Sequence, residues 1–153
     1  MIRHFISVAI FLAGIGWMII TSGGVIWHYL DIPTIIFVVI FPLVFVSILF
    51  GFKETAFAFS VSLKREIKKE KLVNALDFFK IYGKTTWIAG FIGAFIGVIA
   101  ALIYLEDKAA LGSNLAIALF SVLYSGVVNV VIITPFIIFI KKKLNLLNNS
   151  VDY

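Results

Sequence analysis

The amino-acid sequence predicts an all-α integral membrane protein, with four transmembrane helices and a short cytoplasmic helical segment between the second and the third. The chain has 153 residues, of which 62% are hydrophobic, and its mean hydropathy is +1.12. Four apolar stretches are each long enough for a helix of about 20 residues, which crosses the roughly 30 Å hydrocarbon core of a bilayer. Basic residues gather between these stretches. The absence of cysteine excludes disulfides, thiol catalysis and thiolate metal sites.

The first apolar stretch covers residues 5–26. Arg3 in front of it is also typical of a secretory signal peptide. No small-residue cleavage motif closes the stretch, however, and the run Trp27-His28-Tyr29 is typical of a membrane–water interface. We therefore expect a transmembrane helix that is retained in the mature protein.

The second apolar stretch covers residues 34–52. Pro33 suits the first turn of a helix, where its missing N–H would have no partner anyway. Asp31, just before it, complements the positive end of the helix dipole. Pro42 lies within the stretch and removes one backbone hydrogen bond, so we expect a kink there.

Residues 53–85 form a polar segment between the second and third stretches. Apolar residues recur in it at roughly helical spacing, and Asp77 and Lys80 have the separation of a helical ion pair. We expect a helical hairpin or bent helix that lies against the cytoplasmic ends of the spans. Its excess of lysine is typical of a solvated cytoplasmic flank. A docking surface for a cytoplasmic or rotor partner is the alternative.

A short charged turn separates the last two apolar stretches, which cover residues 86–105 and 115–140. In the first of them, Gly90, Gly93 and Gly97 recur at steps of three and four, so one helix face is nearly bare backbone. Helices in lipid associate through close van der Waals contact at such faces. Together with Gly112 before the next stretch, these glycines predict a helix-packing hairpin that promotes assembly.

Lysine and arginine counts predict the orientation, because the cytoplasmic flanks of membrane helices carry an excess of positive charge. Arg3, the segment 53–85 and the lysines at 141–143 lie on one side of the four stretches, and only Lys108 lies on the other. We expect both termini in the cytoplasm and a single membrane domain over residues 1–153. This segregation accounts for the net charge of +5, so we expect no nucleic-acid binding.

The last two stretches resemble the MotA/TolQ/ExbB proton-channel family. The family pattern is roughly G-x-x-G-T-V-x-G in one helix, a loop with an acidic pair, and A-x-G-x-x-x-A-x-A-L-x-T-T-L-Y-G in the next helix. A proline follows the tyrosine by eleven residues. The matching positions are Gly90, Gly93, Ala94, Gly97, Glu106, Asp107, Ala110, Gly112, Ala116, Ala118, Leu119, Ser121, Val122, Leu123, Tyr124 and Pro135. The sequence departs from the pattern at Ala94 and Val122, where many members carry threonine, and at Ser125, which separates the tyrosine from Gly126.

The start of the second stretch resembles the MotA branch of this family, which has paired glycines and an L-x-D-x-P-S-type junction. The corresponding positions are Gly23, Gly24, Leu30, Asp31, Pro33 and Thr34. MotA proteins carry a much larger cytoplasmic insertion, whose charged residues engage the flagellar rotor. The segment 53–85 is short by comparison, so flagellar torque does not follow from the resemblance.

The eight acidic residues all lie outside the four apolar stretches, and His4 and His28 lie at the edges of these stretches. An ion pathway through a membrane usually needs an ionisable group at membrane depth. We therefore expect that this chain does not carry ions by itself. We also expect that it is not an enzyme, and that it has no catalytic residue, metal site or cofactor.

The resemblance implies a partner that supplies the missing carboxylate. Family members form a homopentamer around two single-span MotB/ExbD/TolR-like helices, and an aspartate on each partner helix takes up and releases the ion. The resemblance thus implies a subunit of an ion-driven rotary motor in a bacterial inner membrane, surrounded by lipids. The positions implied to face the ion pathway and the partner are Ala94, Ser121, Val122, Tyr124 and Pro135. Because Ala94 and Val122 lack the oxygen ligands that sodium prefers, we expect coupling to protons.

Two other functions remain open at this point. A small four-span transporter would share the topology, although such transporters normally carry a membrane-embedded glutamate. A structural subunit of a membrane assembly would need no ion pathway. A co-encoded single-span protein with an intramembrane aspartate would distinguish the motor from both.

Overall fold

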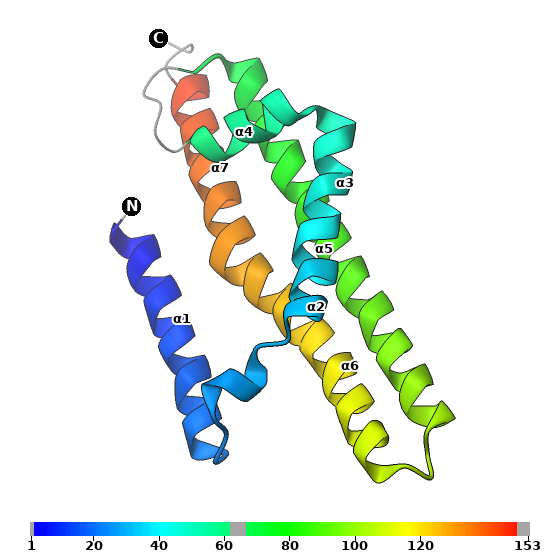
Figure 1. Ribbon diagram of the computed structural model, residues 1–153. Helices are drawn as coiled ribbons and strands as arrows, with labels where there is room; N and C mark the ends of the chain where they lie inside the picture. The colour runs from blue at the N-terminus through cyan, green and yellow to red at the C-terminus, as the bar shows by residue number, and fades with distance from the viewer. Residues whose placement is uncertain (1, 62–66, 150–153) are drawn as a thin grey trace.

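The structure, a computed structural model, describes residues 2–61 and 67–149, with side chains described from residue 6 onward. Helices are the only regular secondary structure in this part of the chain (Figure 1). The predicted all-α fold is therefore confirmed. In chain order the elements are α1 (Ile2–Thr21), the 3-10 turn η1 (Ile26–Tyr29), α2 (Ile32–Ile35), the π-helical segment η2 (Ile36–Ile40), α3 (Phe41–Phe50), α4 (Phe52–Ser60), α5 (Lys69–Ile103), α6 (Lys108–Val128), the π-helical segment η3 (Asn129–Ile133) and α7 (Thr134–Asn149).

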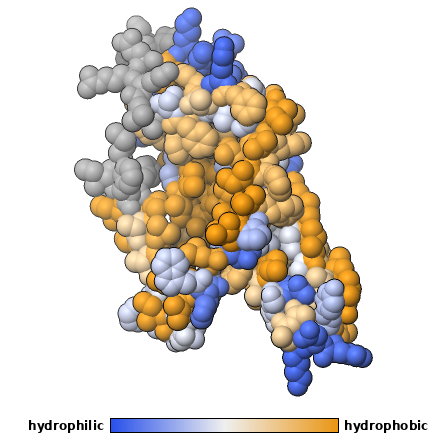
Figure 2. All heavy atoms as spheres, in the orientation of Figure 1, coloured by the Kyte–Doolittle hydropathy of each residue, from blue (hydrophilic) through white to orange (hydrophobic). Residues whose placement is uncertain are grey.

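Several of these elements join end to end into long apolar helices. Among the described residues, three such helices are long and apolar enough to cross a membrane: Ile32–Phe50, Lys69–Ile103 and Lys108–Asn149. The apolar part of α1, Ile6–Thr21, is shorter. Figure 2 shows apolar side chains over much of the visible face of the bundle, with hydrophilic residues at its two ends and a smaller hydrophilic patch between them. This distribution suits a helix bundle surrounded by lipid.

The first helix ends at Thr21, and the prediction that it continues to residue 26 is wrong. The reason is a glycine-based helix end. Gly23 adopts a positive φ of 72°, which L residues with side chains rarely adopt. The Gly24 N–H then donates to the Ile19 carbonyl at 3.0 Å and the Gly23 N–H to the Ile20 carbonyl at 3.1 Å, as in a Schellman motif.

The polar segment 53–85 is divided between two helices and does not form a separate unit. Gly51, with a φ of 88°, ends α3 and turns the chain into α4. α5 then begins at Lys69 and runs without interruption to Ile103, so the last part of the polar segment and the third span share one helix. The predicted Asp77–Lys80 ion pair is present, at 3.0 Å. Residues 62–66 of the segment lie outside the described part of the chain.

The core lies at the α4 end of the bundle and combines aliphatic side chains with a cluster of aromatic rings. Phe78 and Phe79 of α5 are buried. The Phe59 ring of α4 lies 5.2 Å from the Phe79 ring, and the Phe136 ring of α7 stacks on Phe79 at 4.6 Å between centroids. Such ring pairs contribute beyond their buried area. They hold α4 across α5 and α7, above the hairpin of α5 and α6.

Two of the long helices contain a proline within their length, Pro42 in one and Pro135 in the other. A π-helical segment lies just before each of these two prolines. η2 ends two residues before Pro42, and η3 ends two residues before Pro135. Proline lacks an N–H, and its ring clashes with the carbonyl four residues earlier, so the α-helical hydrogen-bond pattern cannot continue through it. At Pro42, where we expected a kink, the structure has a π-helical segment just before the proline.

Candidate functional site

The candidate site is the antiparallel hairpin of α5 and α6, which is the most extensive helix–helix contact in the described structure. Asp107 ends the connecting turn and caps α6. Its Oδ1 atom accepts hydrogen bonds from the backbone N–H groups of Ala109 at 3.0 Å and Ala110 at 3.2 Å. These N–H groups lie in the first helical turn and have no partner within the helix. The acidic residue of the loop therefore fixes where the second helix begins.

The glycine face of α5 packs against α6 of the same chain. A Cβ atom added at Gly93 would lie 2.5 Å from Ser121 Oγ, and one at Gly90 would lie 2.5 Å from Ser125 Oγ. At Gly97 an added Cβ would meet backbone atoms, Ala118 N at 2.7 Å and Asn114 O at 2.8 Å. The two helices therefore approach one another to a distance that only glycine permits.

This packing corrects the role expected for the glycine face. The face is covered by α6 of its own chain, so it is not available to a second copy. Gly112, which was grouped with these glycines, has no heavy atom within 4 Å of the position where its Cβ would be. It makes no close helix contact within the described chain.

Ser121 and Ser125 lie inside the hairpin with their hydroxyl groups already hydrogen-bonded. Ser121 Oγ donates to the Ile117 carbonyl at 2.9 Å, and Ser125 Oγ donates to the Val122 carbonyl at 2.8 Å. Both side chains are essentially inaccessible, at 1% and 0% exposure. In this structure Ser121 therefore faces α5.

Ala94 and Val122 lie together on one side of the hairpin. Ala94 directly follows Gly93, and Val122 directly follows Ser121, which is in contact with Gly93. In two antiparallel α-helices, one step of about 100° from such a contact turns both residues to the same side. The same side carries Trp87, seven residues before Ala94, whose ring lies 3.5 Å from the Cβ position of Gly126. Ala94 and Val122 are both half-buried there.

Tyr124 lies on the opposite side of α6 and anchors the connection between α1 and α2. Its hydroxyl donates to the Tyr29 carbonyl at 2.6 Å and accepts from the Asp31 N–H at 2.8 Å. Asp31 in turn caps α2, because its Oδ2 atom accepts from the Thr34 N–H at 3.0 Å. This anchor was missed by the sequence analysis, since nothing in the local pattern links residues more than 90 positions apart.

The residues expected to face a partner are thus not gathered on one surface. Ala94 and Val122 share a side, Ser121 lies between the helices, and Tyr124 points to the other side. Pro135 is half-buried in the first turn of α7, just after η3.

Polar contacts also fix the hairpin at the level of η3. The Asn129 side-chain amide donates to the Ser125 carbonyl at 2.9 Å and to the Gly83 carbonyl of α5 at 3.4 Å. One residue before Gly83, the Tyr82 hydroxyl donates to the Val39 carbonyl of η2 at 3.2 Å. Two consecutive residues of α5 therefore hold both π-helical segments.

The carboxylates that the structure describes lie in caps, in a turn or in the N-terminal parts of α4 and α5. Asp31 and Asp107 are caps, Glu54 lies 3.7 Å from Lys71, and Asp77 pairs with Lys80. Among the described residues, no group of three or more histidine or acidic side chains could hold a metal ion. The hairpin itself therefore offers packing surfaces, hydroxyls and amides, and its transmembrane stretches contain no carboxylate that could carry an ion.

Comparison with known proteins gives two findings. The model of the MotA/TolQ/ExbB proton channel family matches residues 51–152. Motility protein A of Borreliella burgdorferi is 42% identical over 59 residues, which are 39% of this chain and 23% of that protein. The alignment thus spans about a quarter of that relative's length.

The family match includes α4, the whole α5–α6 hairpin and α7. It does not include the glycine pair and the Leu30–Thr34 junction, to which the resemblance was also expected to extend. The hairpin motif and the match over two thirds of the chain agree. The chain belongs to the MotA/TolQ/ExbB proton channel family.

Proposed function

We propose that this chain is the multi-span subunit of a proton-driven rotary motor or channel in a bacterial inner membrane. Five copies surround two single-span MotB/ExbD/TolR-like helices. The observation that carries the proposal is the hairpin: it has the family's motif and one side with the small residue Ala94 beside Val122, yet no carboxylate at membrane depth. Such a subunit needs a partner to supply the ion-binding group.

The proposed topology has four spans and a single membrane domain. The 20 residues of α1 are about 30 Å long as a helix, enough to cross a bilayer core even though its apolar part is shorter. The lysine-rich ends of α5 and α7 and the α4 segment lie at one end of the bundle, and the α5–α6 turn lies at the other (Figure 1). The excess of positive charge supports a topology with the α4 end and both termini in the cytoplasm.

In the proposed mechanism the chain provides a rigid surface against which the partner's aspartate changes its protonation state. One elementary charge that crosses 100 mV supplies about 2.3 kcal/mol, which is available to move the two subunit types relative to one another. The close packing at Gly93 and Gly97 makes the hairpin rigid. Ala94 and Val122 are the two site residues on the side of the hairpin that we assign to the partner.

The contacts between the five copies must use faces other than the glycine face. α5 carries a row of large exposed side chains seven residues apart, namely Ile88 at 48%, Phe95 at 68% and Leu102 at 59% exposure. These side chains face away from α6 and would lie against lipid or a neighbouring copy.

The proposal is tested by purifying the tagged chain from membranes of its native host in mild detergent. Native mass spectrometry and particle imaging should find five copies together with two copies of a single-span protein that has an aspartate in its span. A stable monomer or dimer as the main species would contradict the proposal. Five copies without such a partner would favour a structural subunit.

A matched pair of variants tests the side assigned to the partner. Val122→Phe adds bulk on the side shared with Ala94 and should reduce the yield of the partner at least several-fold. Ile48→Phe changes an exposed position on α3 and should leave that yield unchanged. Equal partner yields from both variants would show that the partner binds elsewhere.

A further inference from the structure

α1 stands apart from the rest of the bundle (Figure 1). Its closest packing is with the η1 turn that follows it. A groove of about 580 Å³ lies between α1 and α6 and is lined by Phe11, Gly14 and Met18 on one wall and by Leu123 on the other. No helix in the described part of the chain fills this space.

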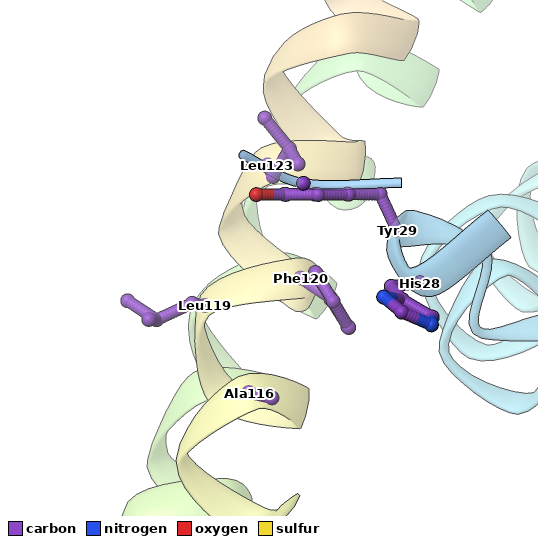
Figure 3. A pocket seen from close by; sticks show the side chains of 7 residues that line it. His28, Tyr29, Ala116, Leu119, Phe120 and Leu123 are labelled. Atoms are coloured by element: carbon purple, nitrogen blue, oxygen red, sulfur yellow. The ribbon is translucent and has the colours of Figure 1, made fainter. Parts of the chain in front are cut away.

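A second hollow of about 510 Å³ continues the groove past Tyr29, because Tyr29 and Leu123 line both. Figure 3 shows the Tyr29 ring between Leu123 and Phe120, with His28 beside it. The Tyr29 backbone is held by the Tyr124 hydroxyl at 2.6 Å, and the Tyr29 and Phe120 rings are 5.9 Å apart. The floor of the groove is therefore fixed by α6.

The lining changes character along the groove. The part along α1 is apolar, whereas Ser22 and His28 mark the end near the α1–α2 connection. Both are exposed, and both belong to the connection that follows the end of α1 at Thr21. An elongated apolar space with a polar end matches the shape and polarity of a lipid chain below its headgroup.

The size of the groove argues against a protein occupant. A transmembrane helix about 10 Å across and 30 Å long occupies roughly 2,000 Å³. The groove and the hollow that continues it together offer only about half of that space, and each alone is within the roughly 300–1,000 Å³ usual for a small-molecule site. In a bilayer such a space does not remain empty, because its lining would lose its van der Waals partners.

We propose that this groove binds an acyl chain of a membrane phospholipid, whose headgroup lies at the level of Ser22 and His28. The lipid comes from the leaflet that faces the α1–α2 connection. It fills the space between α1 and α6 and so fixes the position of α1. This inference requires only that the chain lies in a bilayer, so it can fail while the proposed motor function stands.

The test uses the full chain in vesicles of phosphatidylethanolamine and phosphatidylglycerol that contain a phospholipid with a photoreactive diazirine in one acyl chain. After irradiation, the modified residues are identified by peptide mass spectrometry. Adducts should be several-fold more frequent on Phe11 and Met18 than on Ala9 and Ala13, which lie on the opposite side of α1 by helical geometry. Equal labelling around α1 would show contact with bulk lipid only and would overturn the proposal.

Two glycines of α1 provide matched variants. Neither Gly14 nor Gly16 has a heavy atom within 4 Å of its Cβ position, but only Gly14 lines the groove. Gly14→Leu should place its side chain in the groove and lower the labelling of Met18 and Leu123 at least fivefold. Gly16→Leu should leave this labelling unchanged. If the two variants label alike, the lipid does not occupy the groove.

A third variant tests for a protein occupant. The chain has no cysteine, so Gly14→Cys introduces a single thiol, which can carry a benzophenone cross-linker. With lipid in the groove, irradiation should give cross-links to lipid. Cross-linked dimers of the chain as the main product would show that a second copy fills the groove, and the proposal would be wrong.

Discussion

At Gly97 the two helices of the hairpin touch backbone to backbone, and this contact leads to the first prediction. The Cβ atom of Gly97→Ala would lie 2.7 Å from Ala118 N and 2.8 Å from Asn114 O, atoms that cannot rotate away as a side chain can. We expect the hairpin to be destabilised by about 1–3 kcal/mol, the usual range for overpacking. Thermal unfolding in mild detergent, followed by circular dichroism, measures the effect.

Gly112→Ala is the control for this prediction. Gly112 is also helical, but nothing lies within 4 Å of its Cβ position. Alanine should therefore leave the melting temperature unchanged or raise it, since alanine favours a helix over glycine by up to about 1 kcal/mol. If both variants lowered the melting temperature alike, the close approach at Gly97 would not be the cause.

The Tyr124 hydroxyl leads to a second prediction at the scale of one residue. Tyr124→Phe keeps the ring, which stacks on Phe120, but removes the hydrogen bonds to Tyr29 and Asp31. At about 1 kcal/mol for each bond, the Asp31 amide should exchange its hydrogen about tenfold faster or more. Hydrogen-exchange mass spectrometry of a peptide that includes Asp31 measures this rate.

Tyr104→Phe is the comparison for that measurement, because Tyr104 is 53% exposed at the other end of the hairpin. It should leave the exchange of Asp31 unchanged. If the Asp31 amide exchanged as slowly in Tyr124→Phe as in the unmodified chain, the Tyr124 hydroxyl would not hold the connection between α1 and α2.

At the scale of residues, the sequence predicted which face of its own helix a residue lies on. Glycine spacing correctly indicated a face for close helix packing at Gly90, Gly93 and Gly97. It could not identify the helix on the other side, because periodicity relates residues only to the axis of their own helix. For the same reason the spacing of Tyr124 and Asp31 gave no sign of their contact.

At the scale of helices, hydropathy predicted where apolar segments lie better than where helices end. The family and the all-α fold were confirmed. The end of α1 depended on the φ of Gly23, and glycine is too common in membrane helices to mark such an end by itself. The sequence did not predict that the end of the polar segment and the third span form one helix over residues 69–103. The hydropathy changes along this segment, although the helical backbone continues without a break.

α4 provides the prediction at the scale of helices. The Phe59 ring contacts Phe78, Phe79 and Phe136, so it joins α4 to α5 and α7. Phe59→Ala should lower the free energy of unfolding by about 3 kcal/mol, as other truncations of packed phenylalanines do. Phe52→Ala, at a position that is 67% exposed on the same helix, should change it by less than about 0.5 kcal/mol. Equal melting temperatures for both variants would show that the aromatic cluster does not hold α4.

At the scale of the whole molecule, the distribution of lysines predicts the orientation in the membrane. Lys68 lies just before α5 at the α4 end, and Lys108 begins α6 at the opposite end. In intact cells, a membrane-impermeant maleimide should label Lys108→Cys and should not label Lys68→Cys. The reverse pattern would invert the proposed topology, and labelling of neither position would place both ends out of reach.

The final prediction concerns the ion that the assembled protein uses, and it rests on the proposed motor function. Sodium needs several oxygen ligands at fixed positions, whereas a proton needs only a carboxylate with suitable burial and access to water. On the side of the hairpin that we assign to the partner, Ala94 and Val122 offer no side-chain oxygen. The Ser121 hydroxyl is turned between the helices and donates to the Ile117 carbonyl. We therefore expect proton coupling.

Co-expression of the chain with its partner, in a partner variant that leaks ions, tests this expectation. Cytoplasmic acidification and growth arrest should follow the proton gradient and should not require sodium. The double variant Ala94→Thr, Val122→Thr adds two hydroxyls on one side and at one level of the hairpin, next to the Gly93–Ser121 contact. It is the change that should introduce sodium dependence, and Ile48→Thr, a hydroxyl added at an exposed position of α3, should not. If the unmodified pair already required sodium, the oxygen ligands would have to come from the partner or from backbone carbonyls, and the prediction from Ala94 and Val122 would be wrong.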